Sequence, residues 1–255
     1  MQNFLLKKML VLGTIFLLFG VSTVSALNIN IEPNNIFKDI KNPDPDIETF
    51  YPTDDAGLSQ DAPNTNKGDS ESMTIRNEYG WGGSGWGADG LIKFDISSIP
   101  SRASIIRATL YLFYNKWTST NPAGRLLNVY KITEDWSEMT VTWSNAPTYN
   151  PVASAFSPVP ATVNVWMEWD VTSDVIDFHS GTPNYGWRIR DDNYWGTYDI
   201  PLTQVRTKEF GQELVPYLEI EYTNSRNRDL LNPFFLQLLD NFPILLRLLN
   251  LLIFT

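Results

Sequence analysis

The stretch that decides the predicted fold is Glu134-Asp-Trp-Ser-Glu-Met-Thr-Val-Thr-Trp-Ser-Asn-Ala-Pro147. Within it, Val141 and Trp143 point to one side of an extended chain, while Thr140 and Thr142 point to the other. This alternation is typical of a half-buried strand, and the closing Asn-Ala-Pro is typical of a turn. The stretch therefore predicts a hairpin of a β-sandwich rather than an active site, with Trp143 facing the core and Trp136 at the strand entrance.

Short runs of β-branched and aromatic residues recur on both sides of this stretch, separated by Gly, Pro, Asn and Ser. Such runs without helical periodicity are typical of antiparallel sandwiches. Alternation places Trp169 and Trp187, like Trp143, in the predicted core. The predicted strands cover residues 72–76, 91–96, 105–114, 126–132, 140–143, 163–171, 186–190, 203–208 and 217–222.

One short helix is predicted over residues 174–178, with Thr172 or Ser173 as its N-cap and His179-Ser180-Gly181 at its end. The predicted fold class is all-β: an antiparallel two-sheet β-sandwich of the jelly-roll type with this one short helix, over residues 49–223.

The N-terminal residues have the features of a secretory signal. Lys7 and Lys8 precede an apolar run from Met9 to Val21, and a small-residue stretch ends at Ala26. This pattern predicts a signal peptide over residues 1–26, with an uncleaved membrane anchor as the alternative. We therefore expect a secreted protein, extracellular or associated with the cell surface. Residues 27–48 lack periodicity and are predicted to be a linker.

The C-terminal residues form a second apolar stretch. A polar linker over residues 224–229 leads to an apolar, amphipathic helical tail over residues 230–255, interrupted by Pro243. Three interpretations fit this tail: a segment lying on a membrane surface, a docking helix for a partner or for self-association, and a helix packed on its own domain.

Composition narrows the partners and the chemistry. The formal net charge is −10, which makes nucleic acid a poor partner. Cysteine is absent, so disulfides and thiolate chemistry are excluded. His179 is the one histidine, and no Gly-x-Ser-x-Gly elbow accompanies it. We therefore expect no catalytic triad.

Carboxylates offer two other kinds of site. A glycosidase needs only two of them, and the sources here are Asp54-Asp55, Glu134-Asp135 with Glu138, and Asp191-Asp192. Each pair lies beside turn residues, where aspartate ordinarily bonds its own backbone, so we expect no enzyme activity. Asp54 and Asp55 are instead candidates for a structural Ca²⁺, which binds oxygen ligands.

Aromatic residues are the strongest chemical feature, with 9 tryptophans and 11 tyrosines. Sugar rings present apolar faces that stack on flat aromatic surfaces. Trp81 and Trp86 lie in a glycine-rich loop, Trp117 ends a predicted strand, and Tyr194 and Trp195 lie in a second loop. These residues predict a sugar-binding surface. Alternatively, the loops fold over the sandwich edge and cover it.

The order of the motifs resembles the disaggregatase-related (DNRLRE) domain, also classed as carbohydrate-binding module family 96. The segments that carry the resemblance are residues 54–55, 63–68 (Pro-Asn-Thr-Asn-Lys-Gly), 91–100, 108–112, 134–147, 169–172, 184–191, 207–209 and 216–222. The resemblance implies a secreted β-sandwich module that binds acidic or cell-wall glycans and carries no catalytic residues.

One departure from the family concerns the expected ligand. The family usually has an arginine before the Leu-Ile-Lys-Phe-Asp strand, whereas Ala88-Asp-Gly90 stands here. Lys93 would then serve an acidic sugar alone, or the ligand is different. We expect a secreted or cell-surface, non-catalytic carbohydrate-binding module for a polysaccharide or cell-wall glycan. The alternative is a structural surface or adhesion protein whose tail mediates membrane association or assembly.

Overall fold

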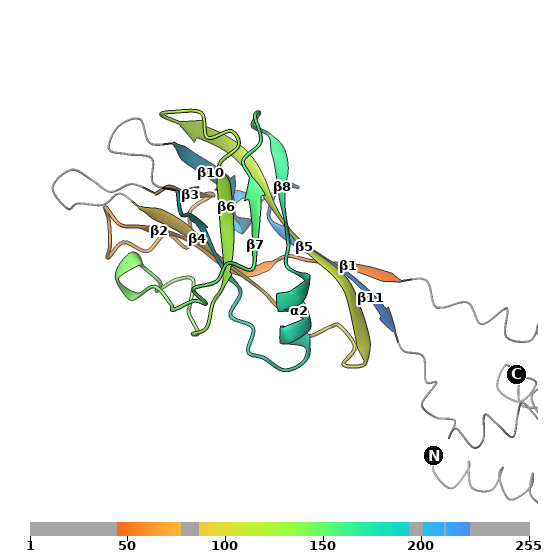
Figure 1. Cartoon of the computed structure of the whole chain (residues 1–255). Coiled ribbons are helices and arrows are strands. Elements are labelled where there is room, and N and C mark those ends of the chain that lie inside the picture. The colour runs from red at the N-terminus through yellow and green to blue at the C-terminus, as the bar shows by residue number, and fades with distance from the viewer. Residues whose placement is uncertain (1–44, 78–86, 194–200, 212, 225–255) are drawn as a thin grey trace, which may run out of the picture. The chain divides into compact units, whose positions relative to one another are not determined.

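The computed structural model describes residues 45–77, 87–193, 201–211 and 213–224 as two antiparallel sheets (Figure 1). The six-stranded sheet runs β1 (Asp46–Phe50), β11 (Tyr217–Asn224), β5 (Ala103–Thr118), β10 (Leu202–Arg206) and β3 (Ser72–Ile75), and β8 (Val165–Asp170) also pairs with β5. The five-stranded sheet runs β2 (Pro52–Ser59), β4 (Ala88–Phe94), β9 (Trp187–Asp191), β6 (Leu126–Lys131) and β7 (Ala155–Pro158). The predicted two-sheet β-sandwich is confirmed.

The long strand β5 organises the six-stranded sheet. β11 pairs with its first part, from Ala103 to Tyr111, and β10 pairs with its last part, from Tyr114 to Thr118. β8 pairs with its middle. At the other edge, β1 pairs with β11, with Asp46 opposite Tyr222, so the first and last described strands are neighbours.

The core between the sheets follows the predicted alternation. Ile92 and Phe94 of β4 and Leu218 and Ile220 of β11 are buried, in contrast to Asp95, which is exposed. The fully buried Trp169 donates its indole N–H to the Leu127 carbonyl at 2.8 Å. Trp187 is also fully buried, and its indole N–H donates to Asp174 Oδ2 at 2.7 Å. Two of the three predicted core tryptophans are thus confirmed, and each has the partner that a buried indole N–H needs.

The predicted hairpin over residues 134–147 is wrong. The segment contains a turn over residues 138–140 and a short 3₁₀ helix, η3 (Trp143–Asn145), and it joins neither sheet. The Asn145 side chain explains the difference, because it accepts from the Thr142 N–H at 2.6 Å and donates to the Thr140 carbonyl at 3.1 Å. Such local side-chain bonds offer the backbone an alternative to sheet pairing.

The burial of the two tryptophans of this segment differs from the prediction, which placed Trp143 in the core and Trp136 at the strand entrance. Trp136 is buried, with 7% of its surface exposed, and its indole N–H donates to the Tyr185 carbonyl at 2.8 Å. Trp143 is only half-buried. A second, smaller core results on the side of the five-stranded sheet that faces away from the main core: Ala56, Leu58, Leu91, Ile132, Trp136 and Val141. The segment therefore covers that sheet.

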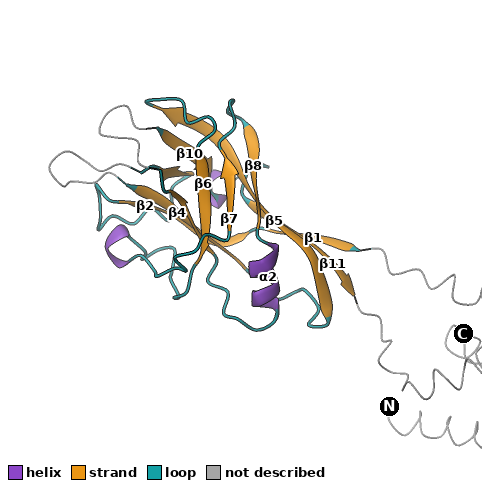
Figure 2. Ribbon diagram, in the orientation of Figure 1, coloured by secondary structure: helices purple, strands orange, loops and turns teal. Residues whose placement is uncertain are grey.

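The single described α-helix is α2 (Thr172–His179), at one end of the sandwich (Figure 2). It contains the predicted range 174–178, but neither predicted cap is right, because Val171 occupies the N-cap position. Asp170 accepts from the Thr172 N–H at 3.0 Å and from its hydroxyl at 2.5 Å.

Three strands were not predicted: β1, β2 and β7. β1 begins at Asp46, inside the predicted linker, and β2 contains the strand-breaking residues Pro, Asp and Gly.

The expected signal peptide over residues 1–26, nearly all of the linker and the tail over residues 230–255 lie outside the described residues. Within the described part of the chain, no helix has the length and apolar character needed to cross a membrane.

Candidate functional site

The predicted ligand-binding residues fall into two groups. Trp81, Trp86, Tyr194 and Trp195 lie outside the described residues. Lys93 and Trp117 are described, but Lys93 belongs to β4 of the five-stranded sheet and Trp117 belongs to β5 of the six-stranded sheet. The described structure therefore does not bring these two residues into one site.

Trp117 lies at the end of β5 and is 37% exposed. It is opposite Thr203 of β10, and Thr203 is in turn opposite Ile75 of β3. Shortly after Ile75, the Asn77 side chain donates to the Asn193 carbonyl at 3.1 Å. Asn77 directly precedes residues 78–86, and Asn193 directly precedes residues 194–200. The described residues that flank the two tryptophan-bearing segments thus meet at the end of the sandwich that carries Trp117.

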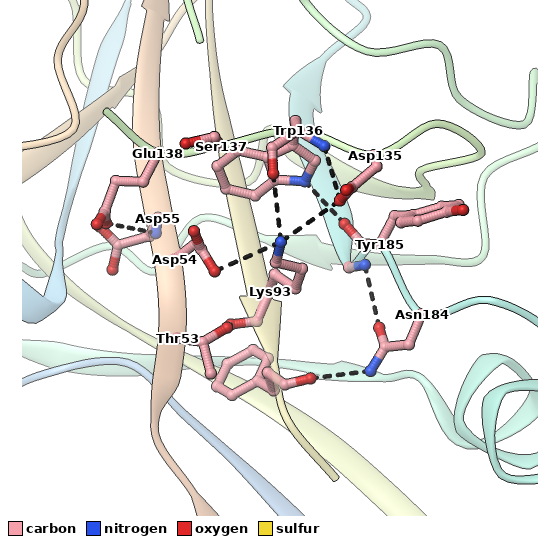
Figure 3. Close-up of polar contacts among 12 residues, drawn as sticks. Thr53, Asp54, Asp55, Lys93, Asp135, Trp136, Ser137, Glu138, Asn184 and Tyr185 are labelled. Atoms are coloured by element: carbon pink, nitrogen blue, oxygen red, sulfur yellow. Dashed lines mark hydrogen bonds and ion pairs between the residues drawn. The ribbon is translucent and has the colours of Figure 1, made fainter. Parts of the chain in front are cut away.

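Lys93 is held by its neighbours (Figure 3). Its Nζ lies 3.4 Å from Asp54 Oδ2 and 3.7 Å from Asp135 Oδ1, and it donates to the Trp136 carbonyl at 3.3 Å. The ammonium also lies 5.2 Å from the centre of the Trp136 ring, within the range of a cation–π contact. These contacts join β2, β4 and the 134–147 segment. Lys93 therefore has a structural role.

Asp54 and Asp55, the two calcium candidates, point in different directions. Asp54 pairs with Lys93, whereas Asp55 is fully buried and its backbone N–H donates to Glu138 Oε1 at 2.9 Å. Burial raises the pKa of Asp55 to about 8, and the negative charges of Glu209 and Glu138 add to the effect. Only Asp55 therefore lies among other carboxylates.

The remaining carboxylates that were candidates for hydrolysis are held in other contacts. Asp191 pairs with the buried Arg125, Asp192 accepts from Asn128 and Tyr130, and Glu134 accepts from the Thr148 hydroxyl. His179 lies at the C-terminal end of α2. Asp191, Asp192 and Glu134 thus have neighbours in the described structure that give each of them a structural role.

Four rings gather on the outer surface of the six-stranded sheet, and sequence reasoning did not identify them as a site. We call Tyr111, Phe113, Trp166 and Tyr217 the aromatic face. Tyr111 and Tyr217 stack with their ring centres 4.4 Å apart and their planes at 13°. Trp166 meets Tyr217 edge-on at 4.9 Å and Phe113 edge-on at 5.2 Å. Phe113 is buried, so Tyr111, Trp166 and Tyr217 supply the accessible part of the aromatic face.

Strand register explains how the aromatic face forms. Tyr111 of β5 is opposite Tyr217 of β11, and Phe113 of β5 is opposite Trp166 of β8. Residues that are opposite each other in antiparallel strands point to the same side of the sheet. Leu110 and Leu112 occupy the alternate positions of β5 and are fully buried. The rings therefore point away from the core.

Acidic side chains surround the aromatic face. Glu168 of β8 is opposite Tyr111, and Glu219 lies two residues beyond Tyr217 on the same side of β11. Burial, followed by the charges of Glu168 and Glu219, raises the pKa of Tyr111. Arg107 Nη2 lies 3.7 Å from Glu219 Oε1 and compensates part of this charge. A raised pKa means that Tyr111 stays a neutral phenol beside these carboxylates.

A polar pocket lies near α2. Its volume is about 310 Å³, and its lining includes Lys131, Asn150, Asp174 and Asp177. Lys131 Nζ lies 2.6 Å from Asp177 Oδ2 and 3.3 Å from Asp174 Oδ1, so its charge is already compensated. The lining contains no aromatic ring, and sugars prefer sites with apolar walls. The aromatic face is the better candidate.

A signal for the aromatic face exists in the sequence. In the run Leu110-Tyr-Leu-Phe-Tyr114, the residues that point to one side of the strand and those that point to the other are all apolar or aromatic. In an ordinary strand with one side facing water, the outward positions would be polar. That departure indicates an aromatic outer surface on this strand.

A family model described as carbohydrate-binding module family 96 matches residues 46–222. The match begins at the first residue of β1 and ends within β11, so it spans the whole sandwich. No curated protein matches the chain.

Proposed function

Because the chain belongs to carbohydrate-binding module family 96, we propose that it binds a polysaccharide or cell-wall glycan through the aromatic face and does not cleave it. The match makes residues 46–222 a carbohydrate-binding module. The structural contacts of the candidate carboxylates support the non-catalytic part of the proposal. Lys93 is already held by Asp54 and by the Trp136 carbonyl, which supports the view that it is not part of the binding surface.

The observation that carries the proposal is the packing of Tyr111, Trp166 and Tyr217 into one half-buried aromatic surface. Apolar C–H faces of sugar rings stack on such surfaces, and the free energy gained is similar to that of other aromatic contacts. The rings already hold one another in place. Binding therefore requires little further loss of side-chain freedom, which favours affinity.

The charges around the aromatic face favour a neutral glycan over a polyuronate. Glu168 and Glu219 flank the rings, and the whole chain has a formal net charge of −10. A polyanionic chain approaching this face would be repelled over about one Debye length, roughly 10 Å at 0.1 M salt. A neutral chain would meet only the rings and the hydrogen-bonding groups beside them.

A second glycan contact is proposed at the end of the sandwich that carries Trp117. The contact between Asn77 and Asn193 brings together the described residues before segments 78–86 and 194–200. This supports Trp117 as the contact at that end, while Trp81, Trp86, Tyr194 and Trp195, which lie outside the described residues, stay predicted binding residues. A long glycan chain could use both surfaces.

The proposed place of action is outside the cell or at its surface. The signal-like residues 1–26 support it.

The test is affinity electrophoresis of the full chain in gels that contain neutral or acidic polysaccharides. The wild-type chain should be retarded by at least one neutral glycan. Combined Trp166→Ala and Tyr217→Ala should weaken binding at least tenfold, about 1.4 kcal/mol, as expected when stacked aromatic contacts are lost. Retardation unchanged in this variant would remove the aromatic face from the proposal.

Two controls sharpen the result. Phe156→Ala removes a ring that is 64% exposed on the other sheet, and it should leave retardation unchanged. Trp117→Ala tests the second contact separately. Thermal unfolding of each variant establishes that it is folded, and new reducing ends after incubation would show cleavage and refute the non-catalytic role.

A further inference from the structure

Four segments that are distant in sequence meet beside β2. They contribute Asp55 of β2, residues 66–68, Glu138 of the 134–147 segment, and Glu209 of η4 (Lys208–Phe210). Figure 3 shows Asp55 and Glu138 side by side. All four segments belong to the motifs that mark the family resemblance. Carbohydrate binding by the aromatic face uses none of them.

Three carboxylates converge where these segments meet. One oxygen from each of Asp55, Glu138 and Glu209 lies within 4.8 Å of the other two. Asp55 is fully buried, and its Oδ1 has no hydrogen-bond partner among the described residues. The buried Glu209 Oε2 likewise has none within the described part of the chain. A buried carboxylate oxygen without a partner is costly, and such a group calls for a specific explanation.

Lys208 compensates only part of this charge. Its Nζ lies 2.8 Å from Glu138 Oε1 and 2.5 Å from Glu209 Oε1, and its backbone N–H donates to Asp55 Oδ2 at 2.8 Å. One ammonium therefore serves two of the three carboxylates. Asp55 Oδ1 and Glu209 Oε2 accept no hydrogen bond from Lys208.

The surrounding backbone holds the carboxylates in place. The Asn66 side chain donates to the Glu138 carbonyl at 2.6 Å and to the Val141 carbonyl at 2.7 Å. Gly68 packs so closely that a Cβ added there would lie 2.5 Å from the Glu138 carbonyl oxygen. The position of Glu138 is thus fixed by neighbours other than the carboxylates themselves, as a preformed site requires.

We propose that Asp55, Glu138 and Glu209 bind a divalent cation of the calcium type. Calcium prefers carboxylate oxygens at about 2.3–2.6 Å, and oxygens within 4.8 Å of one another can share one such ion. The ion would supply the missing partner of Asp55 Oδ1 and Glu209 Oε2. It would also tie β2, the 134–147 segment and η4 together. This site is separate from the aromatic face, and of the two predicted calcium ligands it uses Asp55 and leaves out Asp54, which pairs with Lys93.

The competing explanation is a proton shared between Asp55 and Glu209. Such a proton would satisfy the same two oxygens and would make the fold independent of calcium. Addition of metal distinguishes the two explanations.

The experiment is thermal unfolding of the full chain after treatment with a chelator, with Ca²⁺ then added back, together with calorimetric titration. The melting temperature should rise by roughly 5–10 °C when Ca²⁺ exceeds its Kd about 100-fold. Asp55→Asn should remain folded, because an amide oxygen can still accept from the Lys208 N–H, and it should lose this rise. Glu209→Gln, at a less buried position, is the second variant and should lose it too.

Asp177→Asn is the matched control, because Asp177 of α2 pairs with Lys131 of β6, away from the three carboxylates, and this variant should leave the calcium effect unchanged. A melting temperature that is the same with chelator and with millimolar Ca²⁺ would overturn the proposal and favour the shared proton. A calcium effect that survives in both site variants would overturn it as well. Glycan retardation measured with chelator present reports on the aromatic face alone.

Discussion

Lys93 and Trp136 share two contacts: the Lys93 ammonium lies 5.2 Å from the centre of the indole ring and donates to the Trp136 carbonyl at 3.3 Å. The same indole closes the small core over the five-stranded sheet. A cation on β4 therefore anchors the segment from which the fold was predicted.

Lys93→Met tests this anchor. Methionine keeps most of the apolar stem, but it removes the partner of Asp54 and the donor to Trp136. We expect the free energy of unfolding to fall by about 1–3 kcal/mol, because a half-buried carboxylate loses its compensation. Urea unfolding measures the change. Lys116→Met, at an exposed position of β5, is the control, and an equal loss in both variants would contradict a specific anchor.

Gly68→Ala tests the close approach of residues 66–68 to the 134–147 segment. The added Cβ would lie 2.5 Å from the Glu138 carbonyl oxygen, so the backbone must move. We expect destabilisation of about 1–3 kcal/mol in thermal or urea unfolding, typical of overpacking. Gly57→Ala is the matched control, since its Cβ would meet nothing closer than 3.8 Å. Similar stability of the two variants would refute the close packing.

The hydrogen bonds that Asp170 accepts lead us to expect a specific dependence of stability on pH. The Thr172 side chain and backbone N–H donate to this carboxylate and lower its pKa below the ordinary 3.8. A lowered pKa means that the folded chain gains stability above pH 3.8 and loses it as the pH falls through the folded-state pKa. In Asp170→Asn, the urea concentration at the unfolding midpoint should fall less steeply as the pH is lowered from 6 to 2. An unchanged slope would show that Asp170 does not contribute.

Glu168→Gln combined with Glu219→Gln tests the preference for neutral glycans. Removing both charges should strengthen binding of an acidic polysaccharide several-fold at low salt and leave binding of a neutral one unchanged. Affinity electrophoresis at two salt concentrations gives the comparison, because the gain should shrink as salt is added. If acidic glycans bind the variant no better than the wild type, these carboxylates do not select the ligand.

The sequence predicted the parts of the fold that depend on simple alternation. Ile92, Phe94, Leu218 and Ile220 face the core as expected, because period-two patterning depends only on neighbouring residues. The 134–147 segment was wrongly predicted, since the side-chain bonds of Asn145 and the packing of Trp136 on the five-stranded sheet outweigh the local pattern. Residue type alone does not separate a covering segment from a strand.

The candidate sites were harder to predict for a different reason. Tyr111, Trp166 and Tyr217 come from three strands, and their meeting depends on a register that one sequence does not reveal. The carboxylate cluster likewise joins Asp55 to Glu209 across most of the chain. Asp54 and Asp55 were predicted as a pair because they are adjacent, yet adjacent residues of a strand point to opposite sides.

The pairing of β1 with β11 has a mechanical consequence. Asp46 is opposite Tyr222, and the Asn224 side chain donates to Asp46 Oδ2 at 3.0 Å, so the chain enters and leaves the sandwich at the same corner. Tension between these two ends would load the hydrogen bonds between β1 and β11 one after another, as in unzipping, rather than all together. A module held by its glycan and pulled from one end only would instead carry the load through the sheet.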